Sequence, residues 1–180
     1  MPTFTIRPLG EAAATLDQLA GILVEVVADG GSVSFMHPLA PEVARAFWAG
    51  SLASAARGER IVLGAWDGGG ALLGTVTLLL DTPPNQPHRG EIAKMMTRPS
   101  ARGRGVATAL LAEAERLARQ HDRHLLVLDT ASDGGAGSLY ERCGYQFAGE
   151  IPQFALKPHG GLSGTRIYFK LLAPSRGDAA

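Results

Sequence analysis

The most constraining feature of this 180-residue sequence is the stretch Glu91–Arg119, in which an apolar segment passes directly into a periodic one. The apolar segment ends at Arg98-Pro99, and a turn rich in glycine and arginine follows, Arg102-Gly103-Arg104-Gly105. From Val106 onward the apolar residues recur at helical spacing, which predicts a helix with one buried face. The stretch therefore predicts a strand that leads into a helix through a tight loop.

The start of this helix lacks the residues that usually stabilise a helix N-terminus. Two glycines and two arginines stand where a capping hydroxyl and acidic residues are preferred. The first N–H groups of a helix have no partner within it, and together with the helix dipole they can bind phosphate oxygens. The spacing is neither a P-loop nor a dinucleotide G-x-G-x-x-G. It reads R-x-x-G-x-A, with Arg102, Gly105 and Ala107, and it predicts a bound anion at this point.

Two blocks of the sequence resemble the GNAT superfamily of acetyl-CoA-dependent N-acyltransferases. The R-x-x-G-x-A turn, after a strand and a proline, resembles the loop that holds the pyrophosphate of coenzyme A in that superfamily. Residues 139–145, LYERCGY, resemble its LYE-x-x-G-[FY] signature. The segments 30–36, 98–105, 128–130 and 167–172 further resemble a bacterial branch, the tabtoxin-resistance acetyltransferases, which inactivate a β-lactam amino-acid toxin.

The resemblance implies the GNAT fold, a central twisted mixed β-sheet of about seven strands flanked by about four helices, in the α/β class with an α+β mixed sheet. The periodicity and turn residues agree with this element order. They predict strands at 3–9, 60–66, 71–81, 90–97, 124–129, 145–150 and 165–172, and helices at 11–28, 41–57, 106–119 and 132–142. Ser132 or Asp133 is expected to cap the last helix, Gly144 to end it, and residues 152–163 to form a long loop.

Length and composition favour one domain, which we expect at residues 1–173, followed by a disordered tail at 174–180. Seventeen basic and seventeen acidic residues give zero formal net charge, so neither nucleic acid nor an anionic membrane is the expected partner. The lone Cys143 cannot form an internal disulfide, and no secretion signal or membrane-length apolar run occurs. We expect a cytoplasmic, bacterial protein, a monomer or a homodimer, without a metal.

Acetyl transfer from a thioester to an amine needs an acceptor for the amine proton and a donor for the departing thiolate. The resemblance implies that Tyr140 is this general acid; the alternative is a tyrosine that packs on the sheet. Glu91 and Asp129 lie at strand ends, where a carboxylate is costly unless it is paired or hydrated, so each is expected to face a wet cleft and take the amine proton. Alternatively, Glu91 pairs with Lys94 or a nearby arginine, and Asp129 caps the turn to Thr130.

The resemblance also implies which residues contact acetyl-CoA. They lie on the strand before the turn, in the turn, at the helix start and seven residues before Tyr140: Met95, Met96, Thr97, Arg102, Gly103, Arg104, Gly105, Val106, Ala107, Thr108 and Asp133. Asp133 departs from the asparagine that many relatives use to bond the pantetheine arm, because an ionised carboxylate accepts hydrogen bonds but donates none.

Two loops are expected to border the acceptor amine and to contribute Ser34, Phe35 and Phe154. For the Phe35-Met36 pair the alternative is that it tucks under the domain. Neither 30–38 nor 152–163 contains an acidic residue, which disfavours a polyamine acceptor.

The sequence thus predicts an acetyl-CoA-dependent N-acetyltransferase that acts on a small-molecule amine, such as an amino-acid-like toxin or antibiotic, by direct attack through a tetrahedral intermediate. The alternatives are a peptide or protein N-terminal acetyltransferase and a non-catalytic acyl-CoA-binding sensor.

Overall fold

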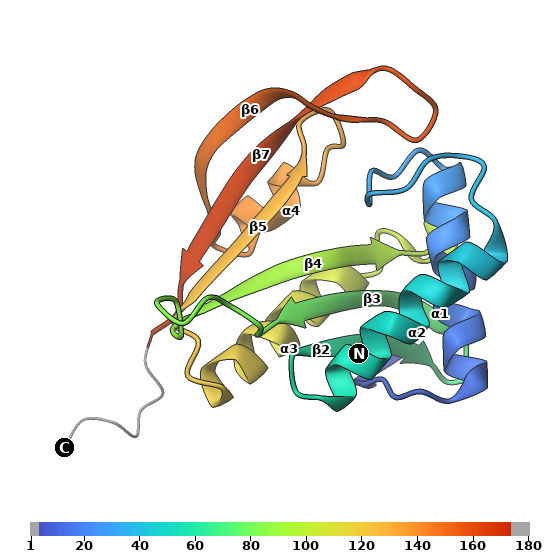
Figure 1. The fold of residues 1–180 in the computed structure, drawn as a ribbon, viewed down its shortest axis with the longest axis horizontal. Coiled ribbons are helices and arrows are strands. Elements are labelled where there is room, and N and C mark those ends of the chain that lie inside the picture. Colours follow the sequence, from blue (N-terminus) through green and yellow to red (C-terminus); the bar gives the residue numbers. More distant parts are fainter. Residues whose placement is uncertain (1–3, 174–180) are drawn as a thin grey trace.

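The structure, a computed structural model, describes residues 4–173, so the expected tail at 174–180 lies outside the described residues. Within this range one mixed sheet has the strand order β1-β2-β3-β4-β5-β7-β6 (Figure 1). The strands are β1 (Phe4–Pro8), β2 (Arg60–Asp67), β3 (Leu72–Leu79), β4 (Arg89–Thr97), β5 (Leu125–Ala131), β6 (Gln146–Leu156) and β7 (Leu162–Leu171). The helices are α1 (Ala13–Ala28), α2 (Pro41–Ala56), α3 (Val106–Gln120) and α4 (Gly137–Arg142), with a 3-10 turn at Pro99–Ala101. The predicted fold class is confirmed.

Helices cover both faces of the sheet. The helices α1 and α2 pack on one face, where Trp48 is fully buried in an apolar cluster with Leu19 and Leu23 (Figure 1). On the other face lies α3, whose buried stripe includes Val106 and Leu110, as its periodicity predicts. The sheet therefore has an apolar core on each side, which fixes the positions of its strand ends.

The sheet opens between its two parallel strands. β4 and β5 pair only from Arg89↔Leu125 to Glu91↔Val127, after which β5 continues beside β7 and β4 continues beside β3 (Figure 1). At the point of separation β4 contains a bulge, because Lys94 and Met95 together oppose the single residue Val76. A bulge bends its strand and increases the local twist, so this one turns β4 away from β5. The result is a wedge that widens toward the C-terminal ends of both strands.

The segment predicted as a loop at 152–163 is instead most of a long hairpin. β6 extends to Leu156 and β7 begins at Leu162, with register shifts in β6 between Phe147 and Gly149 and between Ile151 and Ala155. The prediction was wrong because Pro152 and the later glycines suggest a loop. Pro152 is accommodated in the second irregular region, where Gln153 adopts a positive φ of 53°.

The loop that follows α1 reaches across to the tip of this hairpin. The helix ends in a Schellman motif, with Gly31 N–H donating to the Val26 carbonyl and Gly30 N–H to that of Val27. Further along the loop, His37 N–H donates to the Pro158 carbonyl at 2.9 Å. His159 Nε2 lies 2.9 Å from the Ala28 carbonyl oxygen, so the two segments are joined at two points across the mouth of the wedge.

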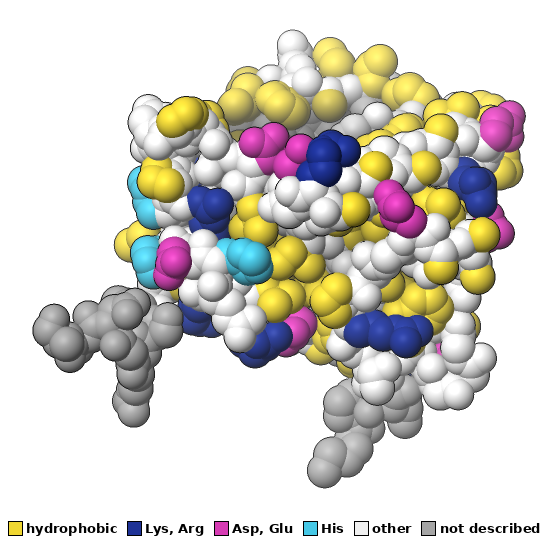
Figure 2. Space-filling model, turned by 60° about the horizontal axis from the view of Figure 1, so that its bottom comes forward, with side chains coloured by type: hydrophobic (Ala, Val, Ile, Leu, Met, Phe, Trp, Pro, Cys, Tyr) yellow, Lys and Arg dark blue, Asp and Glu magenta, His cyan; other side chains and the backbone are white. Residues whose placement is uncertain are grey.

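The surface carries no extended patch of one sign on the face that Figure 2 shows, where Lys and Arg side chains alternate with Asp and Glu among apolar and neutral groups. This distribution matches the zero net charge of the sequence. Within residues 4–173, none of the helices has the length and apolar character required to cross a membrane.

Candidate active site

The wedge between β4 and β5 holds a cavity of about 620 Å³, here called the long cavity. Its walls are the loop after α1, the end of β4 and the turn that joins β5 to α4. Its lining residues include Asp29, Ser32, Met95, Met96, Thr97, Arg102, Ala107, Asp133 and Tyr140. Because the two strands separate, backbone groups of β4 beyond Glu91 have no partner strand on the β5 side. They are therefore available to a ligand in the wedge.

A second cavity of about 270 Å³, the helix-end cavity, surrounds the first turn of α3. It shares Thr97, Arg102, Ala107 and Leu139 with the long cavity. Gly103 and Gly105 have φ values of 73° and 80°, which favour glycine, and an added Cβ at either would meet open space. No side chain caps this helix and no acid lies in its first turn, so its leading N–H groups remain free for an anion.

One further observation fits a coenzyme A pyrophosphate at this helix end. Arg102 lines both cavities, and its guanidinium is held by Asp29 at 2.6 Å, which places a cation beside the glycines.

A third cavity, of about 370 Å³, opens beside the long cavity, and we call it the side cavity. It lies between β4, β5 and the β6–β7 hairpin. Of the residues that the structure describes, Glu91, Lys94 and Asp129 are the only charged ones that line it, and Ser34 and Phe154 also contribute to its wall. Its volume is in the range of small-molecule sites, roughly 300–1,000 Å³.

Tyr140 lines both the long cavity and the side cavity. Its ring is only 5% exposed and packs between Tyr145 and Tyr168, at centroid distances of 5.9 and 6.0 Å. Gly144 ends α4 in a Schellman motif, as predicted, with Tyr145 N–H donating to the Tyr140 carbonyl. Burial raises the pKa of Tyr140 to about 12, with smaller contributions from Asp129 and Cys143, so the phenol stays protonated and can donate a proton at neutral pH.

The two predicted carboxylates both reach the side cavity, each with a partner. Thr165 Oγ1 donates to Asp129 Oδ2 at 2.8 Å from the neighbouring strand β7. Glu91 Oε2 accepts from Arg89 Nη1 at 3.3 Å on its own strand, rather than from Lys94. Each carboxylate retains oxygen lone pairs that could accept a proton from a ligand in the cavity.

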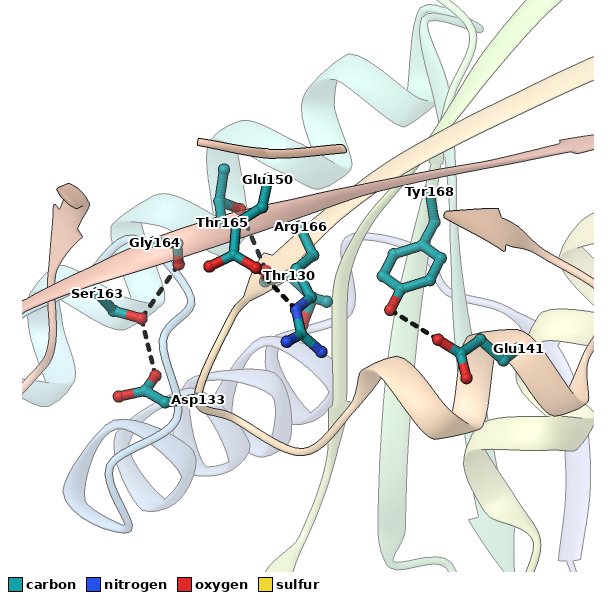
Figure 3. A network of polar contacts seen from close by, with 9 residues as sticks. All are labelled: Thr130, Asp133, Glu141, Glu150, Ser163, Gly164, Thr165, Arg166 and Tyr168. Atoms are coloured by element: carbon teal, nitrogen blue, oxygen red, sulfur yellow. Dashed lines mark hydrogen bonds and ion pairs between the residues drawn. The ribbon is translucent and has the colours of Figure 1, made fainter. Parts of the chain in front are cut away.

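Polar contacts between the β5–α4 turn and β7 brace the wall between these cavities (Figure 3). The Ser163 hydroxyl lies 2.8 Å from Asp133 Oδ1 and 3.1 Å from the Gly164 carbonyl oxygen, and Lys157 Nζ lies 3.2 Å from Asp133 Oδ2. The Ser163 hydrogen bond, followed by Lys157, lowers the pKa of Asp133. The predicted cap is wrong, because α4 begins at Gly137 without a side-chain cap and Asp133 faces Ser163 instead.

The structure brings most of the predicted cofactor residues to the two connected cavities. Met95, Met96, Thr97, Arg102, Ala107 and Asp133 line the long cavity, and Gly103, Gly105, Val106 and Thr108 line the helix-end cavity. Arg104 lies at the exposed rim and lines neither. Phe35 does not line the side cavity either; its ring packs edge-on against Phe47 at 5.2 Å, which is the alternative of tucking under the domain.

The sequence reasoning missed one charged residue of the site. Lys94 was considered only as a partner for Glu91, but it lines the side cavity and donates to Ser34 at 3.1 Å. Its placement depends on the bulge in β4, for which the sequence has no local signal. Among residues 4–173 there is no group of three or more His, Cys, Asp or Glu side chains placed to hold a metal ion.

Two cavities that meet at one protonated phenol suit an enzyme that joins two substrates directly, and the fold around them is that of the N-acetyltransferases. The family model described as the acetyltransferase (GNAT) family matches residues 31–145. The chain belongs to this family and is an N-acetyltransferase, and the family uses acetyl-CoA.

Solved structures share the fold over nearly the whole chain. A ribosomal-protein-alanine N-acetyltransferase from Brucella melitensis is 24% identical, with a TM-score of 0.77 over 93% of this chain and 99% of that one. A provisionally assigned phosphinothricin N-acetyltransferase is 21% identical, with a TM-score of 0.77 over 94% and 99%. A provisionally assigned acetyltransferase from Salmonella typhimurium, solved with its cofactor acetyl-CoA, is 18% identical, with a TM-score of 0.75 over 99% of both chains.

Proposed function

We propose that this enzyme, a single domain of residues 1–173, transfers the acetyl group of acetyl-CoA to the amine of a small, amino-acid-like molecule. The observation that carries the proposal is the position of Tyr140, which lines both the long cavity and the side cavity. A thioester in the first cavity and an amine in the second would meet beside its hydroxyl. No covalent relay is then needed, and Cys143, at the end of α4, lines neither cavity.

The chain would hold acetyl-CoA through the first turn of α3 and the open edge of β4. The N–H groups of residues 105–108 and Arg102 would bind the pyrophosphate, for which Gly103 and Gly105 leave room. Residues 95–97 would offer backbone groups to the pantetheine arm. Bound there, acetyl-CoA supplies an activated acyl group as a thioester.

The residues of the side cavity would then accept one proton from the amine and donate another to the sulfur. An acceptor that binds as an ammonium would first lose one proton to water, because only the neutral amine has a lone pair for attack. Asp129 or Glu91, directly or through a water, then accepts a second proton from the nitrogen as it bonds to the thioester carbonyl carbon. As the tetrahedral intermediate collapses, the carbon–sulfur bond breaks and Tyr140 donates its phenolic proton to the sulfur. One proton has entered the carboxylate and one has left the phenol, so transfer of that proton through water restores both groups.

A small acceptor is favoured by the bridge between the loop after α1 and the tip of the β6–β7 hairpin. The hydrogen bond from His37 to Pro158 and that between His159 and Ala28 span the mouth of the wedge. An extended peptide needs an open groove at this place. The resemblance to the tabtoxin-resistance branch and the phosphinothricin name of one structural neighbour both favour an amino-acid-like toxin or antibiotic.

The alternative acceptor is a peptide N-terminus, for which one structural neighbour is named. Release of coenzyme A thiol from acetyl-CoA should be measured with free amino acids, phosphinothricin and simple amines, and with hexapeptides that begin with alanine. We expect at least one small acceptor to exceed every peptide in kcat/KM by tenfold or more. Turnover confined to peptides would establish the alternative, and tight acetyl-CoA binding without any amine-dependent thiol release would indicate a sensor.

A further inference from the structure

In the described part of the chain, Lys94 is the only cationic residue that lines the side cavity. Its ammonium donates one hydrogen bond, to the neutral hydroxyl of Ser34 at 3.1 Å. Within residues 4–173 it forms no ion pair with a carboxylate at 4.0 Å or less. The centre of the Phe47 ring also lies 5.7 Å from this nitrogen. An ammonium has three donors, so it can still donate to a ligand in the cavity.

The backbone on both sides of this hydrogen bond is held in an unusual conformation. Lys94 has a φ of 50° within the β4 bulge, and Ser34 has a φ of 76° in the loop after α1. Left-handed conformations cost of order 1–3 kcal/mol for residues other than glycine and gather at functional sites. Lys94 lies in the bulge and lines the cavity, and its ammonium donates a hydrogen bond to the Ser34 hydroxyl.

Neither carboxylate of the cavity forms a close ion pair with Lys94, although each keeps oxygen lone pairs for a ligand. Glu91 pairs with Arg89 at 3.3 Å, and Asp129 accepts from Thr165 at 2.8 Å. Burial lowers the pKa of Lys94, whereas Asp129 and Glu91 act in the opposite direction and favour the ammonium. A partly buried cation without a close anion is costly, so the site is better matched to a ligand that brings its own anion.

We propose that Lys94 binds the carboxylate of the acceptor, and that the enzyme therefore selects amino acids and their analogues over amines without an acidic group. This assignment rests on the proposed function, which it makes more specific. The acceptor amine would face Asp129 and Glu91 while its carboxylate faces Lys94, so that both charges of a zwitterion have an opposite charge within one cavity. A neutral amine would leave Lys94 without its anion.

The test compares matched acceptors with and without the carboxylate. Each amino acid that the wild-type enzyme acetylates, phosphinothricin included if it is a substrate, is assayed beside the corresponding carboxamide. The variant Lys94→Asn removes the cation with a residue that tolerates a positive φ, and Lys94→Arg retains the charge. Thermal unfolding of both variants checks that the fold is retained.

We expect the wild-type enzyme to prefer the acid over its amide by about 30-fold or more in kcat/KM, the effect of a charge-assisted hydrogen bond. Lys94→Asn should abolish this preference mainly through a higher KM for the acid, and it should slow the acid far more than the amide. Lys94→Arg should restore most of the preference.

The assignment of Lys94 is overturned if wild-type enzyme uses acid and amide equally, or if Lys94→Asn slows both by the same factor. Either result would leave the proposed acetyl transfer intact. If the wild-type enzyme releases no thiol with any amine, the proposed function itself fails, and this assignment fails with it.

Discussion

The hydroxyl of Thr165 donates a 2.8 Å hydrogen bond to Asp129 Oδ2, from a strand directly paired with that of Asp129. The same hydroxyl lies 3.2 Å from the Thr130 carbonyl oxygen (Figure 3). This contact orients one carboxylate oxygen and leaves the other to face the side cavity. Asp129, which we propose as an acceptor of the amine proton, is thereby held in place by a residue of the neighbouring strand β7.

Glu91→Gln and Asp129→Asn should each slow turnover, because each removes an acceptor of the amine proton. The double variant should lose less than the product of the two single losses, since both groups serve one proton path. The measurement is kcat at saturating amine for the wild-type enzyme, both single variants and the double variant. A wild-type kcat in both single variants would show that solvent or a backbone carbonyl takes the proton.

Tyr140→Phe should lower kcat by about 10² or more while leaving acetyl-CoA affinity nearly unchanged, the range of a lost general acid. The matched control is Tyr145→Phe on the adjacent ring. The Tyr145 hydroxyl is buried without a hydrogen-bond partner among the described residues and lines neither cavity, so its loss should leave kcat within about threefold. A kcat for Tyr140→Phe equally close to wild type would make Tyr140 a packing residue.

The pH profile provides a separate test of the same phenol. Its pKa is raised to about 12, so the proton-donating form persists below that pH and is lost only above it. The kcat profile should consequently show no basic limb due to Tyr140 up to about pH 10. A basic limb near pH 9 that disappears in Tyr140→Phe would contradict the buried, protonated phenol.

Gly105→Val should raise the KM for acetyl-CoA by at least about tenfold, or 1.4 kcal/mol, because a side chain would occupy the space left for the pyrophosphate. Backbone strain is controlled by Gly70→Val in the β2–β3 turn. Gly70 has nearly the same φ, 82° against 80°, and the same open surroundings, but it lies outside both coenzyme cavities. Equal KM values in the two folded variants would remove the pyrophosphate from this helix end.

A buried ion pair outside the site gives a prediction for stability. Lys170 Nζ donates to both oxygens of Glu115, at 2.8 and 2.7 Å, and to the Cys143 carbonyl at 2.7 Å. Lys170→Met should lower the free energy of unfolding by about 3 kcal/mol, since Glu115 would remain buried with only Arg119, at 4.0 Å, as a nearby cation. Arg116→Met, which breaks the exposed pair with Glu113 on the same helix, should cost about 1 kcal/mol or less in urea denaturation. Similar losses in both variants would contradict this distinction.

The parts of the fold that depend on residues close together in the sequence could be predicted from it. The helical stripe from Val106 marks α3, and Gly144 ends α4. The Asp67–Gly70 turn joins β2 to β3, with Asp67 Oδ1 accepting from the N–H groups of Gly69 and Ala71. In each case the residue type itself restricts the backbone or satisfies its hydrogen bonds.

Features decided by distant contacts were not predicted. The bulge at Lys94 exists because β4 must match β3 on one side while leaving β5 on the other. Glu115 lies 4.0 Å from Arg119 on its own helix, but its closer partner is Lys170 of β7, at 2.7 and 2.8 Å, which no local pattern of the sequence indicates. Phe35 could have lined the cavity or packed below it, and the position of Phe47 on α2 decided between them.

The central claim is that both substrates occupy adjoining cavities and react directly beside Tyr140. It is tested most directly by initial rates measured against acetyl-CoA at several fixed concentrations of the best acceptor. Direct attack requires both substrates on the enzyme together, so the double-reciprocal lines should intersect. Parallel lines, the pattern of a covalent acetyl-enzyme that releases coenzyme A before the amine binds, would contradict the account.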